Sequence, residues 1–375
     1  MLRMVCSVAP KSGADMGPLD GVRVIEMAGL APVPFAGMVF ADLGADVVRI
    51  DRTGGGYVAP PGPLDRGKNS IGVNLKDPEG VSLVRELASN ADVFIEGFRP
   101  GVAERLGIGP DELSGLNPRL IYGRLTGWGQ HGPLAARVGH DINYIALTGA
   151  LEFVGREGER PVPAANILGD FAGGGMLLAM GVMGALYERD RSGLGQVIDA
   201  AMVDGSNLLM TFFHGLHATG MWNDKRGTNM TDGGAAYYDT YETADGKFVA
   251  VGAVEPEFFS QLVAVLDIDD SGLDLQIDPR TWPKWRSVLT AKFRERTRDE
   301  WAEVFADIDA CVSPVLSPWE AHEHAHNVAR DAFIEVGGLR QPAPAPRFSR
   351  TPAATPLPLN AKDESAESLL ARWTA

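Results

Sequence analysis

The chain has 375 residues, of which 45% are hydrophobic and 22% are charged, and its 49 acidic and 34 basic side chains give a formal net charge of −15. This length predicts roughly two to three domains with room for a large core. The acidic balance argues against nonspecific binding to nucleic acid or to an anionic membrane surface, because either partner would repel the chain. An anionic ligand therefore needs a local basic pocket.

Cysteine content and apolar runs narrow the setting further. Cys6 and Cys311 form no CxxC pair, so we expect neither a disulfide framework nor a thiolate zinc site, and a reducing cytoplasmic location fits. No apolar run approaches the roughly 18 residues of a membrane span, so no membrane partner is expected. Residues 1–16 lack the apolar segment of a secretion signal, and we expect them to form a disordered extension.

The first half of the chain alternates between strand and helix patterns. Residues 22–27, 35–43 and 46–50 predict a strand, a helix and a second strand. The alternation continues through strand-like runs in residues 71–75, 92–98 and 120–127, with helix patterns between them. It predicts a doubly wound, Rossmann-like α/β domain over residues 17–200.

The second half of the chain changes character. An apolar helix is expected over residues 202–217, within a linker spanning residues 201–229. A hairpin with its turn at residues 244–246, followed by helix patterns, predicts a smaller α+β domain over residues 230–325. Residues 326–375 are rich in proline, which suits a return segment that packs on the large domain.

The loop after the first strand raises the possibility of a dinucleotide site, with Asp51 as the ribose acceptor. The loop has no G-x-G-x-x-G pattern, and Pro32 and Pro34 lack the amides that would hold a pyrophosphate. The sequence therefore disfavours a nicotinamide or flavin cofactor.

The run "HEHAH" matches the zinc-protease pattern H-E-x-x-H, with His322 and His326 as ligands and Glu323 as general base. The surrounding residues are polar and rich in alanine, which is typical of a solvated helix. A zinc hydrolase remains a remote alternative, and we expect no metal.

Basic residues recur after the predicted strands of the first domain, at Arg52, Lys76, Arg99 and Arg105. Open α/β sheets bind ligands at the carboxyl ends of their strands. A scatter of solvated charges is the alternative, but the repeated placement in an acidic chain favours an anionic, phosphate-bearing ligand.

Three residues are candidate proton carriers: His140, Asp170 and Glu255. Each alone has a structural explanation, since Asp170 and Glu255 lie where a helix N-cap or first-turn acid is expected and His140 fits a loop. Taken singly, none of them establishes catalysis.

Six runs follow one another along the chain: "GPLDGVRVIEMAGLAPVPFAGMVFADLGADVVRIDR", "GVNLKDPEG", "ADVFIEGFRPGVAERLGIG", "LTGWGQHGP", "GHDINYIALTG" and "GDFAGGGM". In this order they resemble the CaiB/BaiF superfamily of class III CoA-transferases, and within it the α-methylacyl-CoA racemases. The resemblance runs from about residue 17 to the proline-rich tail.

The resemblance implies an interlocked homodimer, in which each active site forms between the large domain of one chain and the small domain of its partner. It implies an acyl-CoA thioester substrate, with no cofactor beyond the CoA of that substrate. The implied CoA and substrate contacts are Arg52, Val73, Asn74, Leu75, Lys76, Gly97, Phe98, Arg99, Arg105, Gly139, Asp141, Ile142, Asn143 and Tyr144.

The resemblance leaves two chemistries for Asp170. In the transferases the matching carboxylate attacks the acyl-CoA and becomes covalently modified. In the racemases it is an acid/base paired with the histidine at His140, which a glutamate at Glu255 orients. All three positions fit the racemase pattern, so the expected activity interconverts (2R)- and (2S)-2-methylacyl-CoA. Amides at the start of the glycine-rich helix are expected to stabilise the enolate.

Overall fold

The computed structural model describes residues 17–53, 62–269, 271, 276–361 and 364–374, so the expected extension over residues 1–16 lies outside it. The chain divides into two compact units. Unit 1 comprises the described residues up to Tyr144, Ile167–Ser206 and those from Ala329 onward, and unit 2 comprises Ile145–Asn166 and Asn207–Val328.

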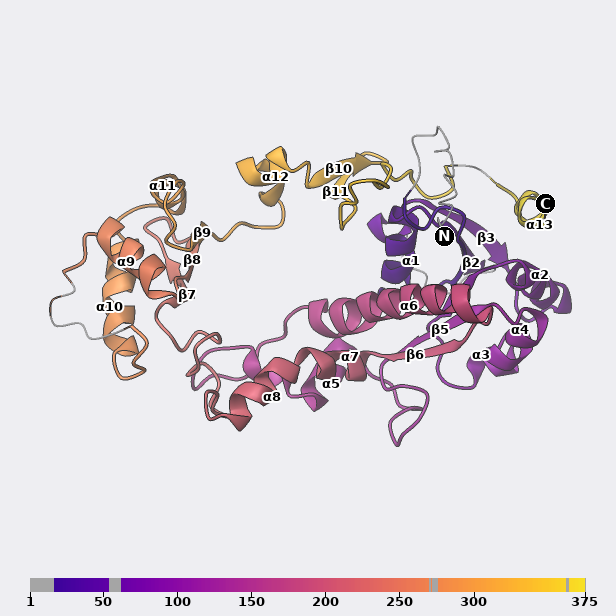
Figure 1. Cartoon of the computed structure of the whole chain (residues 1–375), viewed down its shortest axis with the longest axis horizontal. Helices are drawn as coiled ribbons and strands as arrows, with labels where there is room; N and C mark the ends of the chain where they lie inside the picture. The colour runs from indigo at the N-terminus through magenta and orange to yellow at the C-terminus, as the bar shows by residue number, and fades with distance from the viewer. Residues whose placement is uncertain (1–16, 54–61, 270, 272–275, 362–363, 375) are drawn as a thin grey trace, which may run out of the picture. The chain divides into compact units, whose positions relative to one another are not determined.

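A six-stranded parallel sheet forms the centre of unit 1 (Figure 1). Its strands, in spatial order, are β3 (Lys68–Val73), β2 (Asp46–Arg52), β1 (Arg23–Met27), β4 (Val93–Glu96), β5 (Ile121–Thr126) and β6 (Val197–Ala201). The strand order reverses between β1 and β4, where open α/β sheets bind ligands. The predicted α/β class with a doubly wound sheet is confirmed.

Helices cover both faces of this sheet, because its strands alternate their side chains between two apolar cores. Val24 belongs to one core and its neighbour Ile25 to the other. The helices of unit 1 are α1 (Pro32–Asp42), α2 (Pro78–Ser89), α3 (Val102–Arg105), α4 (Pro110–Leu116), Ile167–Met176, α6 (Leu177–Ser192) and α13 (Ala366–Thr374).

The helices Ile167–Met176 and α6 form one continuous run of 26 residues, in which an 18-residue window with a mean hydropathy of 1.5 meets the length and composition of a membrane span. The expectation that no apolar run approaches that length is therefore wrong. Leu178, Ala179, Val182 and Ala185 are buried against the sheet, as in the core helix of a globular unit. The run is thus only weak evidence for a span.

The C-terminal part of the chain packs on unit 1. A hairpin of β10 (Phe333–Val336) and β11 (Leu339–Pro342) meets the buried Arg66, whose guanidinium donates to Gln341 Oε1 at 2.9 Å and to the Pro342 carbonyl at 2.7 Å. The indole of Trp373 in α13 is 1% exposed and donates to Asp46 Oδ2 at 2.6 Å. These contacts tie residues more than 270 positions apart in sequence.

Unit 2 contains an antiparallel sheet of β7 (Tyr238–Glu242), β8 (Phe248–Gly252) and β9 (Val312–Pro314), and the first two form the predicted hairpin. Trp285, Phe293 and Trp301 pack in its aromatic core. Its main helices are α9 (Pro256–Val265), α10 (Trp282–Phe293) and α11 (Arg298–Val304).

The helix expected over residues 202–217 is two helices, α7 (Met202–Leu209) and α8 (Thr211–Ala218), which meet at Met210. The chain also has shorter helices: Pro63–Asp65 in unit 1, Ala150–Phe153 and Ala321–Glu323 in unit 2, and α5 (Asp141–Leu147) and α12 (Ala325–Ala329), which each contain residues of both units.

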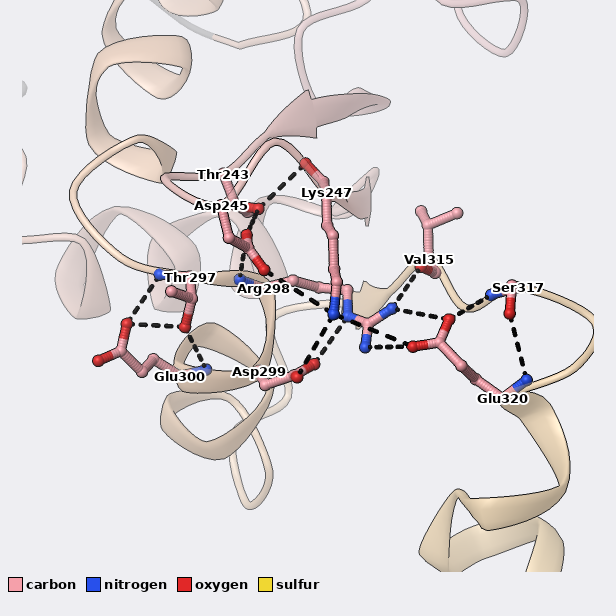
Figure 2. Close-up of polar contacts among 10 residues, drawn as sticks. All are labelled: Thr243, Asp245, Lys247, Thr297, Arg298, Asp299, Glu300, Val315, Ser317 and Glu320. Atoms are coloured by element: carbon pink, nitrogen blue, oxygen red, sulfur yellow. Dashed lines mark hydrogen bonds and ion pairs between the residues drawn. The ribbon is translucent and has the colours of Figure 1, made fainter.

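A polar network centred on Arg298 joins three segments of unit 2 (Figure 2). The Arg298 guanidinium donates to Glu320 Oε1 at 3.0 Å and to the Val315 carbonyl at 3.2 Å, and its backbone N–H donates to Asp245 Oδ1 in the hairpin turn. Beside it, Thr297 and Glu300 cap the start of α11 reciprocally. The network therefore fixes the segment after β9 to the hairpin and to α11.

We expect Trp373→Ala to destabilise unit 1 by about 3–5 kcal/mol, because it removes a buried indole and leaves a cavity. Urea unfolding followed by circular dichroism measures the loss. The exposed neighbour Thr374 provides the control, since Thr374→Ala should change stability by less than about 0.5 kcal/mol. Equal unfolding midpoints for both variants would show that α13 adds nothing to the core.

Candidate functional site

Two cavities lie along the carboxyl edge of the sheet in unit 1. The first, of about 360 Å³, is lined where β1, β2, β3 and β4 end, and the second, of about 290 Å³, where β1, β4 and β5 end. Phe98 lines both, so the two cavities adjoin. Together they occupy the edge at which the strand order reverses.

The first cavity carries two exposed cations, Arg52 and Lys76, on an apolar floor. Its lining residues are Met27, Ala28, Ile50, Asp51, Arg52, Val73, Asn74, Leu75, Lys76, Phe98 and Leu106. This combination suits a ligand with an apolar ring and anionic groups. Six of the positions inferred for CoA, Arg52, residues 73–76 and Phe98, therefore meet on one cavity.

Asp51 lines the same cavity, but its carboxylate is already engaged. It accepts from Arg49 Nε and Nη2, both at 2.9 Å, and from the Ser70 hydroxyl. Arg49 also pairs with Asp65 at 2.5 Å. The carboxylate thus holds β2 and β3 together, which leaves it poorly placed to bind a ribose and agrees with the weak case for a dinucleotide.

The second cavity brings His140 and Asp170 together with Gly97, Phe98, Arg99, Gly139 and Tyr144. These are two of the three expected proton carriers and five of the expected substrate contacts. The remaining expected contacts, Arg105, Asp141, Ile142 and Asn143, do not line either cavity. Arg105 is an exposed residue at the end of α3, and Ile142 and Asn143 are exposed on α5.

Asp141 is a structural link between the segments of His140 and Asp170, the two expected proton carriers on this cavity. Its Oδ2 accepts from the backbone N–H of Gly169 at 2.6 Å and of Asp170 at 2.9 Å. It therefore caps the helix Ile167–Met176 from outside, while lying directly after His140 in the chain. Asp170 lies in the first turn of this helix, so the structural explanation that holds for it is the first-turn acid and not the N-cap.

Glycines let neighbouring elements approach this helix closely. A Cβ on Gly169 would lie 2.7 Å from Asp141 Oδ2, and one on Gly175 would lie 2.8 Å from the Pro32 carbonyl oxygen in α1. Any larger residue would separate the capping carboxylate or α1 from the helix. The run of glycines after Asp170 is thus a packing requirement of the site.

The His140 backbone is fixed by its own turn and by an aromatic pair. Its N–H donates to Asn143 Oδ1 at 3.0 Å, and the Tyr144 hydroxyl donates to the Gly139 carbonyl at 2.5 Å. Burial, reinforced by the nearby carboxylates of Asp170 and Asp141, raises the pKa of Tyr144 to about 12. The phenol therefore stays protonated and keeps donating at physiological pH.

Trp128 and Arg137 also line the second cavity, and the sequence analysis did not identify them. The Trp128 ring packs edge-on against Tyr144 with 4.8 Å between centroids. Trp128 follows the fifth strand in "LTGWGQ", so its position just past a strand end was the available signal.

Glu255 lies in unit 2, at the N-cap position of α9. Its side chain is exposed and makes no capping hydrogen bond. Burial, with Glu255 as the next cause, raises the pKa of the Cys311 thiol. The N-cap position was expected, and the carboxylate is available for another partner because the helix does not use it.

The zinc motif does not form one helix. His322 and Glu323 end a short turn, the chain is extended at His324, and α12 begins at Ala325. His322 and His326 therefore do not face one side of a continuous helix, as the motif requires. Within the described part of the chain, no group of three or more His, Cys, Asp or Glu side chains could hold a metal ion.

We expect Asp141→Ala to lower the free energy of unfolding by about 1–2 kcal/mol, because it leaves two helix amides without their acceptor. Asp77→Ala is the matched control, since Asp77 stands at the N-cap of α2 but makes no side-chain capping bond. Its effect should stay below about 0.5 kcal/mol. Denaturant titration of both variants makes the comparison, and equal losses would contradict the capping role.

Most of the chain is similar to proteins of known family. Residues 19–360 match the sequence model of CoA-transferase family III. Alpha-methylacyl-CoA racemase of Mus musculus is 48% identical, over 89% of this chain and 87% of its own length. Succinyl-CoA:glutarate CoA-transferase of Mus musculus is 31% identical, over 91% and 83%. The crystal structure of a CaiB/BaiF family protein from Brucella suis superposes with a TM-score of 0.79 at 27% identity, over 96% of this chain and all of that one. The chain therefore belongs to CoA-transferase family III.

Proposed function

We propose that this protein is an α-methylacyl-CoA racemase, which interconverts (2R)- and (2S)-2-methylacyl-CoA thioesters. The observation that carries the proposal is that His140 and Asp170 line the second cavity, which adjoins the first cavity with its basic residues Arg52 and Lys76. The 48% identity to a protein named alpha-methylacyl-CoA racemase supports the same reaction. The enzyme works without a metal or redox cofactor, in the cytoplasm.

The first cavity holds the CoA part of the substrate. Arg52 and Lys76 face the phosphates of CoA, and its adenine packs on the apolar floor of the cavity. The loop Gly97–Arg99 lies between this cavity and the second, so the pantetheine arm passes along it toward Asp170. Arg105, at the end of α3, adds positive charge beyond the lining residues.

Inverting the α-carbon requires one group to remove its proton and another to return a proton to the opposite face. His140 and Asp170 take these roles in turn, and the intermediate is an enolate of the thioester. The enolate needs hydrogen-bond donors. Gly169 and Asp170 do not supply them through their amides, because both amides donate to Asp141. This excludes two amides at the start of the helix, while the expectation for the amides that follow Asp170 stays a prediction.

Glu255 orients His140 from the small domain of the partner chain in an interlocked homodimer. Two exposed apolar surfaces support such a dimer. On the continuous run of Ile167–Met176 and α6, Met176, Met180, Met183 and Tyr187 recur on one helix face with 38–68% exposure. On α7 and α8, Leu208, Leu209 and Phe212 are 48–65% exposed. A second copy of the chain covers these surfaces.

The alternative is a CoA-transferase that uses Asp170 as a covalent nucleophile. The 31% identity to a protein named succinyl-CoA:glutarate CoA-transferase keeps it within the family. The racemase is favoured because His140 stands on the same cavity as Asp170, so a second proton carrier is at hand.

The test is incubation with one enantiomer of a 2-methylacyl-CoA in deuterated water. We expect the α-hydrogen to exchange while the thioester racemises, as followed by NMR and chiral chromatography. His140→Ala and Asp170→Ala should each lower the exchange rate by about 10²–10⁴-fold. No exchange in the wild type, with an Asp170 adduct trapped by hydroxylamine, would establish the transferase instead, and loss of activity with a chelator would revive the zinc hydrolase.

Mixed dimers test the shared site. Asp170→Ala and Glu255→Ala chains, each nearly inactive alone, are co-expressed in equal amounts. A mixed dimer then has one intact site, so random pairing should restore roughly a quarter of wild-type activity. Glu257→Gln, in the first turn of the same helix α9, is the control and should leave activity unchanged. No restoration would show that His140 and Glu255 do not meet across two chains.

A further inference from the structure

Glu96 is a buried carboxylate beneath the point where the two cavities adjoin. It is the last residue of β4, and its side chain is fully buried. Oε2 accepts from the backbone N–H of Phe98 at 2.5 Å, and Oε1 accepts from Arg124 Nε at 3.0 Å. Phe98 lines both cavities, so this carboxylate holds the residue that separates them.

The surroundings of Glu96 leave the loop Gly97–Arg99 little freedom. Arg124, in β5, also pairs with Glu104 of α3 at 2.8 Å, so the same network joins β4, β5 and α3. A Cβ on Gly97 would lie 3.0 Å from Val33 Cγ2 in α1, which shows how closely the loop lies against that helix. The hydrogen bond from Phe98 to Glu96 is thus one of the contacts that set the shape of the loop.

The charge on Glu96 is sensitive to pH near neutrality. Burial raises the pKa of Glu96 to about 7, although the Phe98 N–H and Arg124 both favour the ionised form; Glu104 disfavours it. The carboxylate is therefore ionised above that pH and protonated below it. Ionised acceptors make shorter and stronger hydrogen bonds than neutral ones, so protonation weakens the bond to Phe98.

We propose that ionised Glu96 is a positioning residue that holds the Gly97–Arg99 loop in the shape that binds CoA, and that its protonation weakens this binding. The inference rests on the proposed function, because it takes CoA as the ligand of these cavities. It acts through substrate binding, so KM for the acyl-CoA changes while kcat changes little. The loop carries Arg99, which allows a small displacement to move a cation.

The test is titration of the wild type and of Glu96→Gln with coenzyme A by calorimetry between about pH 6 and pH 8.5. Gln keeps the shape of the side chain but cannot ionise. We expect Glu96→Gln to bind about tenfold more weakly than the wild type at pH 8, and the ratio to approach one at pH 6. The CoA phosphates also titrate in this range, but equally for both proteins, so the ratio isolates Glu96.

Glu104→Gln is the matched control, because Glu104 shares Arg124 but does not touch the loop. It removes a negative charge near Glu96, so the pH at which binding weakens should move downward while the affinity at pH 8 stays the same. This shift also tests the proposal if Glu96→Gln fails to fold.

The outcomes separate the two levels of inference. A ratio that does not depend on pH, or an unshifted midpoint in Glu104→Gln, overturns the role of Glu96 and leaves the racemase standing. Failure of the wild type to bind coenzyme A at any pH overturns both. A change in kcat with KM unchanged also contradicts a role in binding.

Discussion

The carboxylate of Asp141 is the contact on which the candidate site depends. It accepts hydrogen bonds from two amides at the start of the helix that carries Asp170, and Asp141 follows directly after His140 in the chain. One side chain therefore joins the segment of His140 to amides 28 and 29 positions further along the chain, at Gly169 and Asp170. The glycine at 169 is the complement of this contact, since any side chain there would occupy the place of the carboxylate.

The parallel sheet supplies the second constraint, because it collects loops that are distant in the chain at one edge. Residues after β1, β2, β3, β4 and β5 meet in two adjoining cavities, and Phe98 stands between them. A substrate with a long, charged carrier and a small reacting end suits this arrangement, since the exposed cations Arg52 and Lys76 line one cavity while His140 and Asp170 line the other. The buried carboxylate of Glu96 accepts from the Phe98 N–H and so contacts the loop between the cavities.

The sequence predicted the sheet of unit 1 well, because each of its first strands is an apolar run bounded by turn residues. It also singled out Arg52 and Lys76, which line the first cavity, and His140 and Asp170, which line the second; the roles of these residues stay predictions. It could not predict Asp141 as the cap of a helix 28 residues away, since the pairing is a tertiary contact without local pattern. The helix 202–217 was mistaken for a single helix because its apolar pattern continues through the break at Met210. Arg105 was placed with the CoA contacts by resemblance, but its side chain lies outside the cavity lining.

The return of the C-terminus to unit 1 has a consequence for how the protein is made. Trp373 and Leu369 complete the core that contains Ile25 and Leu87. Arg66 donates its hydrogen bonds to Gln341 and Pro342, which also come late in the chain. Both segments of unit 2, Ile145–Asn166 and Asn207–Val328, come before these C-terminal residues in the chain. The ribosome therefore synthesises all of unit 2 before the partners of Ile25, Leu87 and Arg66 exist. The nascent sheet therefore exposes one unfinished apolar face until α13 has left the ribosome. Premature termination near the end of the chain would release a polypeptide with that face open to aggregation.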